Sequence, residues 1–555
     1  MKKLIFLLMM MMGLTATAQV DLAAQRAERQ DPGDMGRTAD PSPYGINPRP
    51  KSLKELGGTL DASRGFETDV DFLPRAKKKG VKIHIEYSRG PVDIDGGYIL
   101  QINKKDVAIT AADEQGAFYA LQTLRQIVDA TGLKAIPRMK VIDYPELPRR
   151  GVVEGFYGTP WSHAARLSLI DFYGRNKLNT YIYGPKDDPY HSSPNWRLPY
   201  PEAEARNIHE LVEACRRNHV DFVWAAHPGK DIRWDAADRD SLLRKFEMMY
   251  DLGVRNFALF FDDIEGEGTN PYRQVELLNW LTDNFVTPKG DVGPLAVCPT
   301  DYSRLWANPT EHGANAIYGR ELRPEIQVMY TGDVVCSDLT ADTMNFFNAL
   351  IRRPGYYWWN WPVTDYARNF LLQGPAYGLD TSLTSAEVAA LVSNPMEHAE
   401  ASKLGLYGVA DYAWNPLQYS PLENWERGLR ELMPECPEAY RTFAIHSADT
   451  ATGYRRHESW ETDSTTLRAD LEALIAAVDT IRERAGNRAL VAELSPWLDA
   501  AQLLGRQGLE VLDAATKAEA RAAAEEIKKA DAETPTLGTL HLRPMILEVY
   551  ENLPD

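Results

Sequence analysis

The sequence predicts a (β/α)8 barrel that is preceded by a small α/β domain and followed by a helical bundle. Three observations predict it: short apolar runs of strand length recur along the middle of the chain, helix-length segments such as 200–220 and 240–253 separate them, and polar and aromatic residues follow the runs. A doubly wound open sheet is the alternative, but no glycine-rich nucleotide-binding motif follows any run. We interpret eight runs as buried strands: 151–154, 179–183, 221–225, 257–261, 295–298, 325–330, 356–360 and 404–410.

The chain is expected to begin with an export signal over residues 1–18. Two lysines, an apolar run and the small-residue site Ala16-Thr-Ala18 follow one another there, and the run is too short to span a bilayer. The mature chain would then start near Gln19, and the protein would be periplasmic or secreted. The net charge of -18 argues against nucleic acid or an anionic membrane as a partner.

Two further domains are expected on either side of the barrel. We assign the chain after the signal to three parts: an extended segment with a small α/β domain (19–148), the barrel (149–430) and a helical domain (431–555). In the first part, apolar spacing predicts three strands and a helix: 81–87, 97–103, 107–110 and 114–130. In the last part, six apolar residues share one helix face: Leu467, Leu471, Leu474, Ile475, Val478 and Ile481.

The cysteines and histidines give no indication of a metal site. Cys215, Cys298, Cys336 and Cys436 are far apart and have no ligand spacing. Export permits disulfides, but Cys298 and Cys336 lie in or just after predicted buried strands, where a small apolar thiol is the ordinary explanation. We therefore expect neither a metal nor an organic cofactor. Three isolated histidines are expected to make structural hydrogen bonds: His163, His227 and His398.

Two adjacent carboxylates, Asp262 and Asp263, end the apolar run 257–261 and are followed by Ile264-Glu-Gly266. Ligands bind at the carboxyl ends of parallel strands, so the pair is a candidate catalytic site. The alternative is that Asp262 caps the following helix and Asp263 is merely solvated. Tryptophan, tyrosine, aspartate and asparagine gather after the other runs, and this mixture is typical of a sugar site, because ring faces stack on aromatics and hydroxyls need hydrogen-bonding partners.

Three motifs together resemble glycoside hydrolase family 84, the family of O-GlcNAcase and related β-N-acetylglucosaminidases: 150–161, 183–190 and 260–264. The resemblance runs from about Arg149 to Trp414. It implies a retaining exo-β-N-acetylglucosaminidase that removes terminal β-linked GlcNAc from a glycan or glycoprotein. The rivals are a non-catalytic glycan-binding protein, a hyaluronidase-like endo-acting member, and a family 20-like β-hexosaminidase, whose barrel normally presents Asp-Glu. The small α/β domain resembles the one that precedes the barrel in several hexosaminidase families.

The resemblance also implies a mechanism that suits adjacent acids. Carboxylates on consecutive residues cannot easily flank one sugar ring as nucleophile and acid. In substrate-assisted hydrolysis the sugar's own 2-acetamido oxygen attacks the anomeric carbon and forms an oxazoline, which water then opens. By resemblance, Asp262 orients and polarises the acetamido N–H, and Asp263 is the general acid and base. The two carboxyl groups must then have different pKa values, so that Asp262 is ionised while Asp263 is protonated near neutral pH.

The substrate-binding residues are likewise transferred from the family. Gly155 would offer its backbone carbonyl to one sugar hydroxyl, and Lys186 would donate to another. Tyr302 would support the acetamido group in the intermediate, and Thr331 and Trp358 would form walls of the pocket that holds its methyl. Hydroxyl-binding positions are matched by three more: Asn360, Asp365 and Asn394. Asn394 could instead cap a helix that starts nearby, and Tyr330 stands where the family often has tryptophan.

Overall fold

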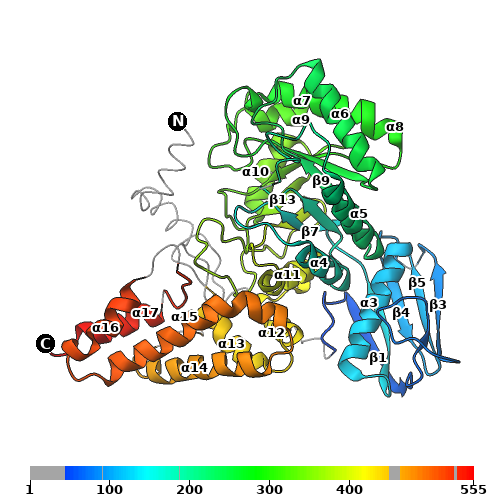
Figure 1. Ribbon diagram of the computed structural model, residues 1–555. Helices are drawn as coiled ribbons and strands as arrows, with labels where there is room; N and C mark the ends of the chain where they lie inside the picture. Colours follow the sequence, from blue (N-terminus) through cyan, green and yellow to red (C-terminus); the bar gives the residue numbers. More distant parts are fainter. Residues whose placement is uncertain are drawn as a thin grey trace.

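The computed structural model describes residues 44–90, 92–186, 188–448, 460, 463–529, 534–539 and 541–555. The predicted export signal, 1–18, lies outside these residues. The described chain forms three parts that follow one another along the sequence: a small α/β domain, a barrel, and a group of helices that packs against the barrel (Figure 1). None of the helices in these ranges combines the length and apolar character that crossing a bilayer requires.

The small domain is a six-stranded sheet in the order β1-β6-β4-β5-β3-β2, with helix α3 (Glu114–Thr131) packed against it. Helix α3 begins where the Asp113 carboxylate accepts the Gly116 N–H, and it ends at Gly132, whose φ of 70° favours glycine. The strands β3, β4 and β5 and helix α3 confirm the four predicted elements. The strand bounds are β1 (Ser52–Leu60), β2 (Phe66–Glu67), β3 (Val81–Tyr87), β4 (Tyr98–Ile102), β5 (Asp106–Ala111) and β6 (Ile136–Asp143).

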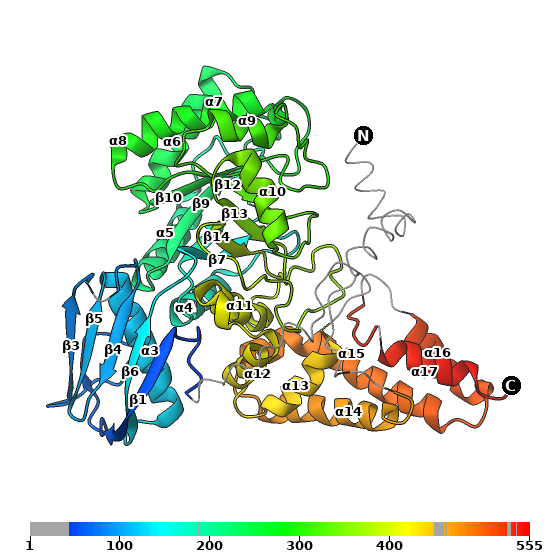
Figure 2. The same ribbon diagram turned by 180° about the vertical axis from the view of Figure 1, so that it is seen from behind.

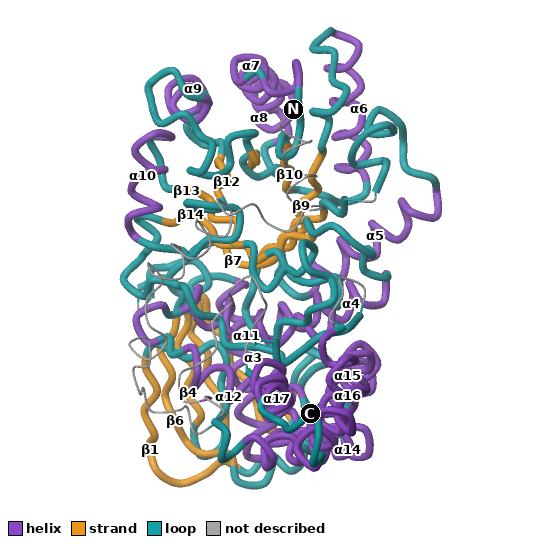
Figure 3. The backbone as a smooth tube through the Cα atoms, turned by 90° about the vertical axis from the view of Figure 1, so that its left-hand side faces the viewer, coloured by secondary structure: helices purple, strands orange, loops and turns teal. Residues whose placement is uncertain are grey.

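Eight parallel strands close into a barrel, which confirms the predicted fold class. Adjacent strands follow one another in sequence, and β14 closes the ring on β7 (Figures 2 and 3). In this last pairing Val392 lies opposite Gly151. Gly151 is required there, because a Cβ would lie 1.8 Å from the Thr180 carbonyl oxygen. The strands are β7 (Arg149–Glu154), β8 (Thr180–Tyr183), β9 (Asp221–Ala226), β10 (Asn256–Phe260), β11 (Ala296–Cys298), β12 (Gln327–Tyr330), β13 (Gly355–Trp359) and β14 (Val388–Ser393).

The eighth strand is β14, and the prediction of a strand at 404–410 is wrong. That segment lies in helix α11 (Ala399–Trp414), all 16 residues of which are buried. Because α11 is buried on every side, its middle at 404–410 is a continuous apolar run, which periodicity cannot distinguish from a buried strand. Gly405 permits the close packing of α11, because a Cβ there would lie 2.7 Å from the Trp361 ring.

Helices cover the outside of the barrel between successive strands. Helices α5 and α6 correspond to the predicted segments 200–220 and 240–253. The helical elements are α4 (His163–Arg175), α5 (Glu202–Arg217), α6 (Ala236–Asp251), η1 (Gly266–Thr269), α7 (Pro271–Leu281), η2 (Thr282–Val286), α8 (Thr287–Lys289), α9 (Ala314–Glu321), α10 (Ala341–Ile351) and η3 (Pro416–Gln418).

The C-terminal helices share an apolar core with the outer layer of the barrel. Helices α14 and α15 pack on each other, and α15 also contacts α11, so buried side chains continue from the barrel into these helices. In α14 five of the six predicted core residues are buried, and Ile475 is partly exposed. The helices are α12 (Pro421–Leu432), α13 (Pro437–His446), α14 (Leu467–Arg484), α15 (Arg488–Asp513), α16 (Lys517–Lys528) and α17 (Leu542–Glu551).

The small domain is joined to the barrel through buried polar contacts. Trp414, at the end of α11, lies in the apolar core of the small domain and donates from Nε1 to Asp143 Oδ1 at 2.7 Å. Lys177 Nζ lies 3.1 Å from Asp143 Oδ2, and neither side chain has any exposed surface. Removing one partner of such a pair would leave a buried charge, so these contacts fix the two domains relative to each other.

Candidate active site

The two adjacent acids lie at the carboxyl end of β10, a fully buried strand of the barrel. All five residues of β10 are buried, and after Phe261 the chain turns at Asp263, whose φ is 52°. Aspartate tolerates this left-handed conformation better than most residues. Asp262 and Asp263 consequently contact different partners. Asp262 does not cap a helix, because its side chain is bound by Lys186 from the loop after β8.

Asp262 is a buried anion held by a cation. Lys186 Nζ lies 2.5 Å from Oδ2, and His227 Nε2 lies 3.5 Å from Oδ1 and 2.9 Å from the Asp262 backbone oxygen. Burial alone would raise the pKa of Asp262, but Lys186 and His227 outweigh it and hold the pKa well below its usual range. Asp262 is therefore ionised at neutral pH, as the sequence predicted. Its Oδ1 is buried and accepts no hydrogen bond from the described residues.

Asp263 is held by two phenols. Tyr157 donates to Oδ2 and Tyr302 donates to Oδ1, each at 2.8 Å. Burial raises the pKa of both phenols, and the neighbouring carboxylates raise it further, so both remain protonated donors. Tyr157 is nearly half exposed, at 46%, and its ring lies 5.3 Å from Lys186 Nζ. Asp263 thus lies nearer the surface than Asp262, between groups that present hydroxyls to it.

The wall beside the acids is built from β7, β13 and β14. Trp358 lies 5.3 Å from the Phe260 ring, centroid to centroid, and directly over Gly155, where a Cβ would come within 2.5 Å of the indole. Trp358 Nε1 donates to Asn360 Oδ1 at 2.8 Å, and Asn394 Nδ2 donates to the same oxygen at 2.9 Å. Asn394 follows β14 directly and does not begin a helix. Its Oδ1 is buried and has no hydrogen-bond partner in the described part of the chain.

The last two predicted residues join the same group through backbone contacts. The Thr331 N–H donates to the Tyr302 carbonyl at 2.8 Å, immediately after β12. Asp365 Oδ2 accepts the Tyr157 N–H at 2.9 Å, and burial raises the pKa of Asp365. All ten predicted residues therefore gather at the carboxyl end of the barrel.

Two further residues of the site were not predicted. Tyr157 belongs to the motif 150–161, but nothing in the sequence indicates that its hydroxyl reaches Asp263 from another strand. His227 was expected to make only structural hydrogen bonds, although it follows β9 as the other site residues follow their strands. Its position directly after β9 could have indicated a role in the site, because β9 was the barrel strand to which no site residue had been assigned.

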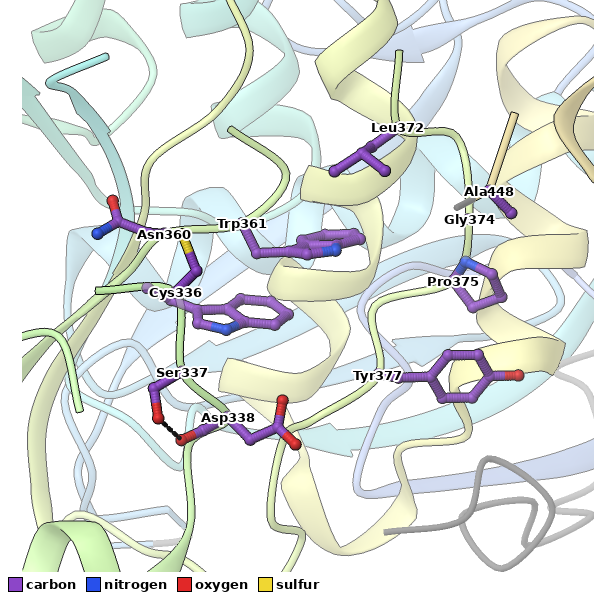
Figure 4. A pocket seen from close by; sticks show the side chains of 11 residues that line it. Cys336, Ser337, Asp338, Asn360, Trp361, Leu372, Gly374, Pro375, Tyr377 and Ala448 are labelled. Atoms are coloured by element: carbon purple, nitrogen blue, oxygen red, sulfur yellow. Dashed lines mark hydrogen bonds between the residues drawn. The ribbon is translucent and has the colours of Figure 1, made fainter. Parts of the chain in front are cut away.

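A separate small cavity of about 20 Å³ lies next to the site and does not contain the acids. It is lined by Trp361, Tyr377 and Asp338 among others, and Asn360 is the one predicted site residue on its wall (Figure 4). We place the candidate active site at the acids, because the converging carboxylates, phenols and Lys186 are there. Among the described residues no group of three or more histidine, cysteine, aspartate or glutamate side chains is arranged to hold a metal.

The fold and site define a barrel glycoside hydrolase. The solved structure named CpGH84B is similar to 91% of this chain and 99% of its own, with a TM-score of 0.80 and 28% identity. CpGH84D gives the same TM-score at 25% identity, and a mutant of the Thermobaculum terrenum O-GlcNAc hydrolase matches 73% of this chain and 95% of its own with a TM-score of 0.64 and 25% identity.

A family model described as beta-N-acetylglucosaminidase matches residues 150–445. The chain belongs to this family, which confirms the resemblance to glycoside hydrolase family 84. A second model, described as glycosyl hydrolase family 20, domain 2, matches residues 45–144, the small α/β domain.

Among curated relatives, the protein O-GlcNAcase of Rattus norvegicus is 30% identical over 275 residues, and the aligned region is 47% of this chain. The chain spans only 29% of the length of that relative. The N,N'-diacetylchitobiase of Vibrio harveyi is 30% identical over 112 residues, or 20% of this chain and 12% of the relative.

Proposed function

We propose that the protein is a retaining exo-β-N-acetylglucosaminidase that removes terminal β-linked GlcNAc by substrate-assisted catalysis. The observation that carries the proposal is the environment of Asp262 Oδ1. This oxygen is buried on an ionised carboxylate, yet it accepts no hydrogen bond in the described structure. An unpaired buried acceptor is costly, so a donor from the substrate is the expected partner. The N–H of a 2-acetamido group is such a donor, and a plain glucoside has none.

The two acids then divide the reaction. Asp262 holds the acetamido N–H, so that the acetamido oxygen attacks the anomeric carbon. The new C–O bond forms while the bond to the leaving oxygen breaks, and Asp263 gives its proton to the leaving oxygen. In the second half, water attacks the anomeric carbon, its proton passes to Asp263, and the oxazoline reopens to the acetamido group. Two displacements at one carbon retain its configuration.

The remaining residues support this assignment. Asn394 Oδ1 is a second buried acceptor without a donor and suits a sugar hydroxyl. Trp358 offers an apolar wall for the acetamido methyl, and Tyr302 can donate to the acetamido oxygen once the substrate is bound. As substrate we propose a glycan or glycoprotein with terminal GlcNAc, as in O-GlcNAcases. Export through residues 1–18 remains part of the same proposal.

The first experiment compares an aryl β-N-acetylglucosaminide with the matching aryl β-glucoside. We expect hydrolysis of the acetamido sugar alone, and none by the Asp262→Asn/Asp263→Asn double variant. Hydrolysis of both sugars at similar rates would contradict participation by the acetamido group. No hydrolysis of either would favour a glycan-binding protein.

A second experiment separates the roles of the acids. Asp263→Asn should slow aryl glycosides with poor leaving groups far more than those with good ones, because a good leaving group needs no proton. Asp262→Ala should slow both classes equally. Fluorination of the acetamido methyl should also slow the unmodified protein, since it weakens the carbonyl as a nucleophile, and an unchanged rate would exclude the oxazoline route.

A further inference from the structure

His227 has a geometry that ordinary core packing does not require. It follows β9 and is only 3% exposed, and its Nε2 faces two oxygens of one residue, the backbone oxygen of Asp262 at 2.9 Å and the carboxylate Oδ1 at 3.5 Å. A carbonyl oxygen can only accept, so Nε2 must carry the proton. This N–H therefore binds the main chain of Asp262 and lies beside Oδ1, the carboxylate oxygen that accepts no hydrogen bond from the described residues.

A second histidine holds this imidazole in place. The backbone N–H of His227 donates to the backbone carbonyl of His191 at 2.7 Å, and the two rings lie 6.3 Å apart in an edge-to-face arrangement. His191 Nδ1 lies 2.8 Å from the Ala225 carbonyl oxygen and so carries a proton. Burial lowers the pKa of His191 to about 4, so this ring is neutral at neutral pH. His191 is therefore a buried, neutral neighbour that holds the main chain of His227 and packs against its ring.

We propose that His227 is a positioning residue for the acetamido step, which aims Asp262 Oδ1 at the substrate N–H. Lys186 binds the other oxygen, Oδ2, and on its own would leave the carboxylate free to rotate about that contact. His227 limits this freedom because its hydrogen bond holds the Asp262 backbone and its ring lies beside Oδ1. The distance of 3.5 Å leaves Oδ1 able to accept a shorter hydrogen bond from the substrate. The inference rests on the proposed function, because it assigns His227 to one step of that mechanism.

Two substitutions separate positioning from core packing. Glutamine can place its side-chain nitrogen about where imidazole places Nε2 and can still donate, whereas phenylalanine fills the space and donates nothing. On an aryl β-N-acetylglucosaminide we expect His227→Phe to lower kcat/KM about 100-fold, the effect of misplacing a reacting group by roughly 1 Å, and His227→Gln to retain activity within about tenfold. His163→Phe, at a half-buried histidine of α4 that binds Glu210, is the control and should not change the rate.

A double-variant comparison tests whether His227 acts through Asp262. If it does, adding His227→Phe to Asp262→Ala should cause no further loss, whereas a general structural defect would add its own factor. The loss in His227→Phe should also be the same for good and poor leaving groups, unlike the loss in Asp263→Asn. Additive losses, or a loss that depends on the leaving group, would overturn the proposal.

Where His227→Phe fails to fold by circular dichroism, His227→Asn replaces it, because that amide is one methylene shorter than glutamine and cannot reach both oxygens. Equal activities of the asparagine and glutamine variants would overturn the role. The activity of the unmodified protein separates a failure of the proposed function from a failure of the role of His227. If that protein shows no acetamido-dependent hydrolysis, the proposed function fails and the role of His227 falls with it. If it does show acetamido-dependent hydrolysis, the activities of the His227 variants decide whether His227 positions Asp262.

Discussion

Replacing Lys186 with methionine is expected to destabilise the protein near neutral pH and to move the acid limb of its activity to higher pH. Lys186 Nζ and Asp262 Oδ2 are 2.5 Å apart, and the side chains are only 10% and 8% exposed. Two unit charges at that distance attract by about 7 kcal/mol at an effective dielectric constant of about 20. Desolvation of both ions offsets part of this, and removing one partner of such a buried pair costs about 3–5 kcal/mol.

The direction of the pH effect follows from Asp262. Its pKa is depressed, with Lys186 as the largest favourable cause, so its contribution to stability is present above the carboxyl's unfolded-state pKa and is lost as pH falls through the folded pKa. Without the ammonium group, Asp262 takes up a proton at a higher pH. In the proposed mechanism the protonated form cannot polarise the acetamido N–H, so the acid limb of kcat/KM should move upward in pH.

The assay is urea unfolding near neutral pH together with kcat/KM measured from about pH 4 to 9. Lys245→Met is the matched control, because Lys245 is also buried in the barrel but lies over the rings of Tyr200 and Trp224. The control should keep the acid limb in place. An unfolding free energy for Lys186→Met within about 1 kcal/mol of the unmodified protein, or an unmoved acid limb, would refute the reasoning.

Three further outcomes are expected. Gly155→Ala should lower kcat/KM on an aryl β-N-acetylglucosaminide about 100-fold in steady-state kinetics, because the added methyl group would displace the Trp358 ring. That ring is held by packing and by the hydrogen bond from its Nε1 to Asn360. Gly405→Val should cost roughly 1–3 kcal/mol of stability through overpacking against Trp361, measured by urea unfolding. Burial raises the pKa of Glu493 to about 7; its stabilising effect is therefore complete below the unfolded-state pKa of about 4.3 and lost as pH rises towards 7, so Glu493→Gln should flatten the fall in thermal stability across that range.

Much of the barrel could be predicted because its strands are locally distinctive. Seven of the eight apolar runs are bounded by turn residues and fall on barrel strands, as with 257–261 and β10. The failure at 404–410 has a physical cause: α11 is buried on every side, and this stretch of it has no charged or amide side chain to indicate a helical period. Strand β1 was also missed, since it is largely exposed and interrupted at Gly57-Gly58, and its stability comes from pairing with β6 about 80 residues away.

The site could be predicted to the extent that its chemistry is local in sequence. Asp262 and Asp263 are recognisable because they end a buried strand, and the motifs around them match a family. The contact between Tyr157 and Asp263, and that between His227 and Asp262, join residues that only barrel closure brings together. Asn394 shows the same limit, because its place after β14 was hidden while the eighth strand was assigned to a later segment.

The apolar core shared by the barrel and the C-terminal helices has a consequence for how the molecule can move and be divided. Side chains of α11 pack both on the barrel strands and on α12 and α15, while Trp414 at its end is buried in the small domain. A helix that belongs to three cores offers no hinge plane between them. Substrate entry must then depend on loops at the carboxyl ends of the strands, and a barrel excised without its flanking parts would expose apolar surface and should aggregate.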